Sequence, residues 1–190
     1  MIDILGSESE IPKKIEGWNH TFQLARPYIK ENGIGIDVGC REGGFAREME
    51  DEFTHIHCFD FRDKKKMFEK NVLDMSKFTY HVCGIGETEG TTFTTSHAVG
   101  RIKDKGHVAI PIKTIDWFDL ENVTFIKYDI EGYELKAIQG SEKTIKKYNP
   151  VIVVEQNKGN IYAQELLESW GYKCKGIDKI FNQDYIMVKE

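Results

Sequence analysis

Residues 34–44 read IGIDVGCREGG, a short apolar run that ends near a carboxylate and opens into a glycine-rich turn. A helix-like stretch from Gly43 to Glu50 follows, so the segment predicts a strand, a glycine loop and a helix in that order. The spacing is D-x-G-x-x-x-G, not the G-x-G-x-x-G of dinucleotide-binding proteins. We expect Gly39 to let the backbone approach a ligand and Gly43 to let the helix start close against the strand.

Strand-like and helix-like segments alternate through most of the chain, a pattern that predicts an α/β fold in which helices cover a parallel sheet. The expected strands are 34–38, 55–61, 79–83, 123–130 and 151–155, and two extended segments follow at 172–177 and 184–188. The expected helices lie before residue 33, with a kink at Pro27, and at 62–75, 132–148 and 161–170. The helix at 132–148 should be interrupted near Gly140, where Ser141 would cap its second part.

One segment between the expected strands has a different composition. Residues 84–106 are rich in Gly, Thr and Ser and predict a loop that contains a short strand at 91–95. Residues 108–114 alternate enough to form another short extended piece.

Length and charge limit the possible classes of protein. The 190 residues fit one domain, with a helical lead at 1–33, a ligand-binding core at 34–156 and a C-terminal helix and strands at 157–190. The formal charge of −5 makes nucleic acid an unfavourable partner. No secretory signal and no long apolar window is visible, so we expect a cytoplasmic protein without membrane contact. The oligomeric state is not predicted.

Four acids, Asp37, Asp60, Asp129 and Glu155, stand at or near the ends of expected strands. Ligands of open parallel sheets collect outside these strand ends. Asp60 follows Asp37 by 23 residues, near the offset of about 20 at which a second strand delivers an acid to ribose hydroxyls. The pattern favours a nucleoside site over the alternative, a plain glycine turn followed by a surface acid.

Two further segments carry a family resemblance. Residues 114–118 read TIDWF and residues 125–134 read FIKYDIEGYE. They resemble the FkbM family of O-methyltransferases, in which a T-[LI]-D segment leads into a strand ending K-x-D-[VI]-E-G-x-E. Together with residues 37–43, Gly140 and the strand at 150–155, the resemblance covers most of residues 34–156.

The resemblance implies a Rossmann-like class I methyltransferase fold, with a mostly parallel central sheet flanked by helices and an antiparallel C-terminal strand. It also implies S-adenosylmethionine as the cofactor and a hydroxyl of a sugar or small natural product as the acceptor. The cofactor site would comprise Asp37, Gly39 and Gly43 at the methionine end, Asp60 at the ribose, Cys83 and Gly84 at the adenine, and Asp129 beside the methyl group. Cys40, Arg41 and Phe61 belong to the same predicted site, although the family usually has A-N and F-E-P at these places.

Methyl transfer to a hydroxyl needs a group that accepts the proton. We favour Asp129 as this base, with Glu131 and Glu155 as the next candidates. Glu131 and Glu134 also suit a helix start, where acids are favourable. His97 and His107 are candidates for contact with the substrate, whereas His55, His57 and His81 fit ordinary strand positions.

Three alternatives stay open at this point. A non-catalytic module could keep the nucleoside pocket without methylating anything. A metal-assisted, catechol-type enzyme could bind magnesium through Asp129, Glu155 and Gln156, since hard cations prefer such oxygens, but no metal site is the favoured prediction. A nicotinamide-dependent oxidoreductase is disfavoured by the missing G-x-G-x-x-G.

Overall fold

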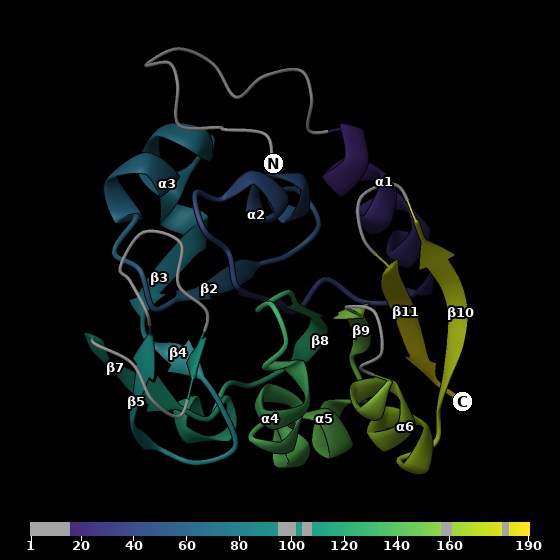
Figure 1. Cartoon of the computed structure of the whole chain (residues 1–190). Helices are drawn as coiled ribbons and strands as arrows, with labels where there is room; N and C mark the ends of the chain where they lie inside the picture. Colours follow the sequence, from purple (N-terminus) through teal and green to yellow (C-terminus); the bar gives the residue numbers. More distant parts are fainter. Residues whose placement is uncertain (1–15, 95–101, 104–107, 157–160, 180–182) are drawn as a thin grey trace.

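The computed structural model describes residues 16–94, 102–103, 108–156, 161–179 and 183–190, and Figure 1 shows the arrangement of its elements. The main sheet has seven strands: β1 (Ile34–Val38), β2 (His55–Asp60), β3 (Phe78–Val82), β8 (Val123–Tyr128), β9 (Val151–Gln156), β10 (Tyr172–Asp178) and β11 (Gln183–Lys189). Their order is β10-β11-β9-β8-β1-β2-β3. Only β11 runs antiparallel to its neighbours, β9 and β10. The prediction of a mostly parallel sheet with an antiparallel C-terminal strand is confirmed.

The α-helices of the described ranges cover the two faces of this sheet (Figure 1): α1 (Glu16–Ala25), α2 (Gly44–Met49), α3 (Lys65–Asn71), α4 (Glu134–Gln139), α5 (Glu142–Tyr148) and α6 (Tyr162–Ser169). The helices α1–α3 pack on one face through Phe22, Phe45 and Phe68. The helices α4–α6 pack on the other face. Within β8, Phe125 belongs to the first core and Ile126 to the second, because successive side chains of a strand point to opposite faces.

Two expected helix boundaries lie where the sequence places them. The first helix ends at Ala25, and a 3-10 turn over Arg26–Tyr28 carries Pro27. The helix after β8 is interrupted between Gln139 and Glu142.

The expected capping of α5 by Ser141 is wrong. The Ser141 hydroxyl donates instead to the Ala137 carbonyl at 2.7 Å. The carboxylate of Asp116 takes the capping role, since it accepts hydrogen bonds from the Lys143 and Thr144 backbone N–H groups at 3.0 and 2.9 Å. The cap therefore comes from a residue far along the chain, which a local reading of the helix start does not reveal.

A second, smaller sheet lies beside the main one (Figure 1). It contains β4 (Gly84–Ile85), β5 (Gly90–Thr94), β6 (Ile102–Lys103) and β7 (Val108–Lys113), in the order β4-β7-β5-β6. The short strand expected at 91–95 is present as β5, but the surrounding segment forms sheet where the sequence predicted mainly loop. Pairing of β4 and β5 with β7 explains the difference, because it joins residues 14 to 28 positions apart.

Three histidines line up on β2 and β3. The His57 Nδ1 and His81 Nε2 atoms lie 2.9 Å apart, and the His81 ring stacks on Phe59 with centroids 4.4 Å apart. His55 Nε2 lies 2.8 Å from the Thr79 hydroxyl. Burial, assisted by the neighbouring histidines, lowers the pKa of His57 and of His81 to about 4.

The histidine row predicts an acid-sensitive fold. An unfolded histidine has a pKa near 6.5, so the unfolded chain binds more protons than the folded chain between about pH 6.5 and 4, and stability falls as the pH falls through this window. Between pH 7 and pH 5, the urea concentration at the midpoint of unfolding should fall less for a His57→Gln variant than for the wild type. Parallel losses in the two proteins would contradict this account.

Candidate functional site

The four strand-end acids lie along one edge of the main sheet. Asp37, Asp60 and Glu155 belong to β1, β2 and β9, and Asp129 directly follows β8. These strands are parallel neighbours, so their carboxyl ends meet at the same edge. The negative charges of Asp129 and Asp60 both act on the Asp37 carboxyl. The structure therefore brings together the acids that the sequence proposed.

Lys127 lies at the centre of this edge. Its Nζ is 2.9 Å from Asp129 Oδ2, 3.8 Å from Asp37 Oδ1 and 4.8 Å from the centroid of the Phe45 ring. Burial lowers the pKa of Lys127, but the carboxylates of Asp129 and Asp37 outweigh it and hold the pKa above its ordinary value. A buried lysine is rare without a partner, so its place inside an apolar strand was a signal that this residue matters.

Asp37 is the most deeply buried of the acids, with an exposed fraction of 0%. Burial raises its pKa to about 6, against the attraction of Lys127. Neither carboxylate oxygen accepts a hydrogen bond from any described residue. Because buried polar groups almost always have partners, the carboxylate has the character of a ligand-binding group.

Asp129 and Glu155 form a pair of acids in different states. Burial opposes ionisation of Asp129, but the nearby Lys127 charge holds its pKa below the ordinary value. Burial and the Asp129 charge raise the pKa of Glu155 to about 9. A hydrogen bond joins the two side chains, and the opposite directions of the two pKa shifts favour Glu155 as its donor and Asp129 as its acceptor. Environments that separate the pKa values of neighbouring acids are typical of active sites.

Two further acids border this pair. Glu131 is exposed on the turn after β8, where its φ is 61°, and its charge also acts on Glu155. Asp184, on β11, lies opposite Glu155 in the strand register. Burial raises the pKa of Asp184 to about 6, against the attraction of Lys127. Sequence reasoning missed Asp184, because its position depends on how β11 inserts between β9 and β10.

The glycine loop is held by close backbone packing. A Cβ at Gly39 would lie 1.9 Å from the Asp129 carbonyl oxygen, and the φ of Gly39 is 91°. A Cβ at Gly43 would lie 2.7 Å from the Phe68 ring of α3. The contacts thus differ from those expected. The absence of a side chain at Gly39 lets Asp129, at the end of β8, approach closely, and its absence at Gly43 lets Phe68 of α3, not the strand, approach closely.

Asp60 is fully engaged by the chain itself. Its carboxylate accepts hydrogen bonds from the backbone N–H of Arg41 at 3.1 Å and of Arg62 at 2.8 Å. The Arg62 guanidinium adds two more through Nε and Nη2, each 2.8 Å long. A carboxylate has about four acceptor positions, so a ribose would have to displace the guanidinium. Sequence reasoning missed Arg62, although an arginine two residues after a strand-end acid is well placed for such a pair.

The remaining predicted cofactor residues divide into two groups. The side chains of Cys40 and Cys83 are buried in the two cores, and burial raises the pKa of both thiols, that of Cys83 to about 11. A cofactor could use only their backbone groups. Gly84 begins β4, and Phe61 packs against Ile110 and Ile112 of β7.

The metal-binding alternative gains nothing from the described side chains. Within the described ranges, no three His, Cys, Asp or Glu side chains are arranged so that they could hold a metal ion together. The Gln156 amide donates to Gln164 at 3.0 Å. His97 and His107 lie outside the described residues.

No helix in the described part of the chain is long and apolar enough to span a membrane.

Known proteins share this architecture. The family model for the FkbM methyltransferase domain matches residues 17–186. An FkbM methyltransferase from Methylobacillus flagellatus KT has a similar structure, with a TM-score of 0.64 and 19% identity over 85% of this chain and 46% of that chain. This chain therefore spans about half the length of that structure.

Two other solved structures cover nearly the whole chain. An rRNA methylase from Streptococcus thermophilus has a TM-score of 0.52 and 9% identity over 96% of this chain and 99% of its own. A protein from Streptococcus mutans, solved in complex with SAH, has a TM-score of 0.55 and 9% identity over 92% of this chain and 98% of its own. No curated protein matches the sequence. These likenesses confirm the Rossmann-like class I methyltransferase fold, and the family match over residues 17–186 shows that the chain belongs to the FkbM methyltransferase family.

Proposed function

We propose that the chain transfers a methyl group from S-adenosylmethionine to a hydroxyl of a sugar or small natural product. Membership of a methyltransferase family supports the cofactor, as does the fold neighbour that binds SAH (S-adenosylhomocysteine). The observation that carries the proposal is the ionised Asp129 carboxylate, held by Lys127 at the strand edge beside Asp37. A formal charge of −5 argues against a nucleic-acid acceptor.

The residues at this edge fit the proposed cofactor. The buried Asp37 carboxylate, which lacks hydrogen bonds from the described residues, would accept them from the amino group of the methionine end. The Asp60 carboxylate would bind the ribose hydroxyls once the Arg62 guanidinium moves aside. The loop from Gly39 to Gly43 offers backbone groups between these two acids. When bound, the cofactor supplies the electrophilic methyl group.

The chain's own task is to orient and deprotonate the acceptor. Methyl transfer from a sulfonium is an in-line displacement, so holding the acceptor oxygen in line provides much of the catalysis. Asp129 would accept a hydrogen bond from the acceptor hydroxyl and take its proton as the new bond forms. Lys127 keeps Asp129 ionised, and the protonated Glu155 fixes its orientation by a hydrogen bond. Glu131, exposed at the rim, is the next candidate for the base.

An Asp129→Asn variant tests this assignment. We expect it to bind SAH about as tightly as the wild type but to turn over about 10²- to 10⁴-fold more slowly, the usual contribution of a general base. Calorimetry with SAH and NAD measures binding, and SAH production against a panel of methyl glycosides and phenols measures turnover. A Glu142→Gln variant on the surface of α5 serves as the control.

Three results would count against the proposal. A preference for NAD over SAH would contradict the proposed methyltransferase activity. An Asp129→Asn enzyme that turns over at the wild-type rate would show that Asp129 is not the base. Tight SAH binding by a wild type that methylates nothing in the panel would favour a non-catalytic nucleoside-binding module.

A further inference from the structure

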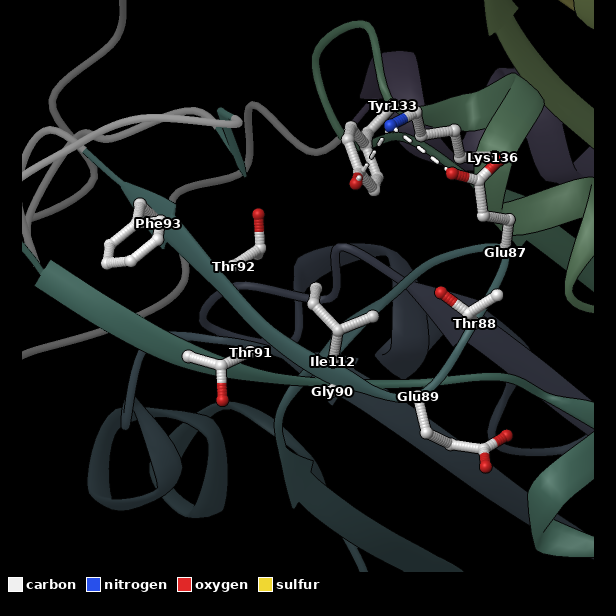
Figure 2. A pocket seen from close by; sticks show the side chains of 10 residues that line it. All are labelled: Glu87, Thr88, Glu89, Gly90, Thr91, Thr92, Phe93, Ile112, Tyr133 and Lys136. Atoms are coloured by element: carbon white, nitrogen blue, oxygen red, sulfur yellow. Dashed lines mark hydrogen bonds and ion pairs between the residues drawn. The ribbon is translucent and has the colours of Figure 1, made fainter.

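A hollow of about 250 Å³ lies between the small sheet and the start of α4 (Figure 2). Its walls come from the segment that joins β4 to β5, from β5 and β7, and from Tyr133 and Lys136. Its volume is below the roughly 300–1,000 Å³ of pockets for drug-sized ligands, so it suits one ring-sized unit. We propose that this hollow seats the methyl acceptor and selects an uncharged, polyhydroxylated ring over an anionic one. The inference rests on the proposed function.

The hollow is connected to Asp129 by a single tight turn. Glu131 and Gly132 both have left-handed backbones, with φ of 61° and 106°. The Glu134 carboxylate locks the turn, since it accepts hydrogen bonds from the backbone N–H groups of Ile130 and Gly132, each 3.0 Å long. Four residues span at most about 14 Å even when extended. The proposed base and the Tyr133 ring therefore stand at the two ends of one short, rigid connection.

The hollow also shares a wall with the predicted ribose site. Phe61 directly follows Asp60 and packs in one apolar cluster with Ile110, Ile112 and Tyr133. Ile112 and Tyr133 line the hollow as well. The hollow and the predicted ribose site therefore border the same apolar cluster.

The lining combines apolar surface with hydrogen-bonding groups. Figure 2 shows Ile112 and Thr92 pointing to the side on which Tyr133 lies, with Thr88 and Glu87 at the edge. Ile112 and the Tyr133 ring can contact the C–H groups of a ring, whereas hydroxyl and carboxylate oxygens accept hydrogen bonds from its hydroxyls.

The charges around the hollow disfavour an anion. Among the described residues that line it, Lys136 is the one cation, and its Nζ lies 3.4 Å from Glu87 Oε1 and 3.4 Å from the Tyr133 hydroxyl. The Glu89 side chain points away from Tyr133 (Figure 2), and its carboxylate accepts a hydrogen bond from the Thr114 hydroxyl at 3.0 Å. A phosphate or carboxylate group on the acceptor would therefore meet the charge of Glu87 and would have to compete with it for Lys136.

Saturation-transfer NMR on the full chain with SAH present tests the hollow. The probes are the methyl glycosides of glucose, galactose, mannose and N-acetylglucosamine, with glucose 1-phosphate as the anion. We expect at least one glycoside to bind the wild type, and glucose 1-phosphate to bind about tenfold more weakly, a difference of about 1.4 kcal/mol. Tyr133→Ala should weaken the glycoside about tenfold, and SAH affinity should stay unchanged. Tyr162→Ala, on α6 outside the hollow, is the matched control.

A charge variant gives a second, independent readout. Glu87→Gln removes an acid from the lining together with its ion pair to Lys136, so glucose 1-phosphate should bind several-fold more tightly while the neutral glycoside changes little. Glu142→Gln is its control.

The outcomes separate this inference from the proposed function. If the wild type does not bind SAH, the proposed function is contradicted. If SAH binds, the hollow is the wrong site when no glycoside binds, when Tyr133→Ala binds the glycoside as well as Tyr162→Ala does, or when glucose 1-phosphate matches the neutral probes.

Discussion

Alanine at position 39 is expected to cost about 2–5 kcal/mol of folding free energy. The left-handed backbone of Gly39, with φ of 91°, costs a residue with a side chain about 1–2 kcal/mol. The new Cβ would also lie 1.9 Å from the Asp129 carbonyl oxygen. Such overpacking typically costs a further amount of about 1–3 kcal/mol. Urea unfolding followed by circular dichroism measures the loss. Because domains are stable by only about 5–15 kcal/mol, this loss would be a large part of the total.

Gly132 provides the matched control for this prediction. Its φ of 106° is also left-handed, but a Cβ there would meet nothing within 4 Å. Gly132→Ala should therefore show only the backbone cost of about 1–2 kcal/mol. If the two variants lose the same folding free energy, the close approach of Gly39 to Asp129 does not contribute to stability.

Replacing Asp60 by alanine is expected to weaken SAH binding about 100-fold or more. The carboxylate would accept hydrogen bonds from both ribose hydroxyls, and a hydrogen bond to a charged group contributes about 1.5–3 kcal/mol. Calorimetry measures the affinity. An unchanged affinity would show that the ribose binds elsewhere.

Arg62→Ala should have the opposite effect. Both guanidinium hydrogen bonds occupy acceptor positions that the ribose needs, while the backbone donors of Arg41 and Arg62 remain in the variant. Release of the carboxylate should tighten SAH binding by about 3- to 10-fold, the scale of a partly exposed ion pair. Arg26→Ala, which breaks a distant pair with Glu52, is the control. If Arg62→Ala weakens SAH as Asp60→Ala does, Arg62 holds Asp60 in place and does not compete with the ribose.

Local patterns predicted the central strands well. The run at 34–38 is apolar, stops at a glycine that no other residue can replace without strain, and forms β1 with the same bounds. The predicted strand at 151–155, a β-branched run after Pro150, forms β9, which extends one residue further to Gln156. Such elements carry their own start and stop signals, so no information from distant residues is needed.

Features that depend on distant partners escaped prediction. Gly84 and Ile85 become a strand only because Ile112 and Lys113 lie beside them. Asp116 caps a helix that begins 26 residues later. Arg62 and Asp184 join the site through contacts that the tertiary structure creates. The residues of the site that lie at strand ends could be predicted, whereas those that tune their charge could not.

The insertion of β11 between β9 and β10 affects the order in which the sheet can form. Residues 183–189 follow all the other strands of this sheet in the sequence, yet they occupy an interior place in it. Before they are added, β10 has no hydrogen-bonding neighbour in the sheet, and the acid Asp184 is missing beside Glu155. The charges around Lys127 therefore reach their folded arrangement only after β11 has inserted.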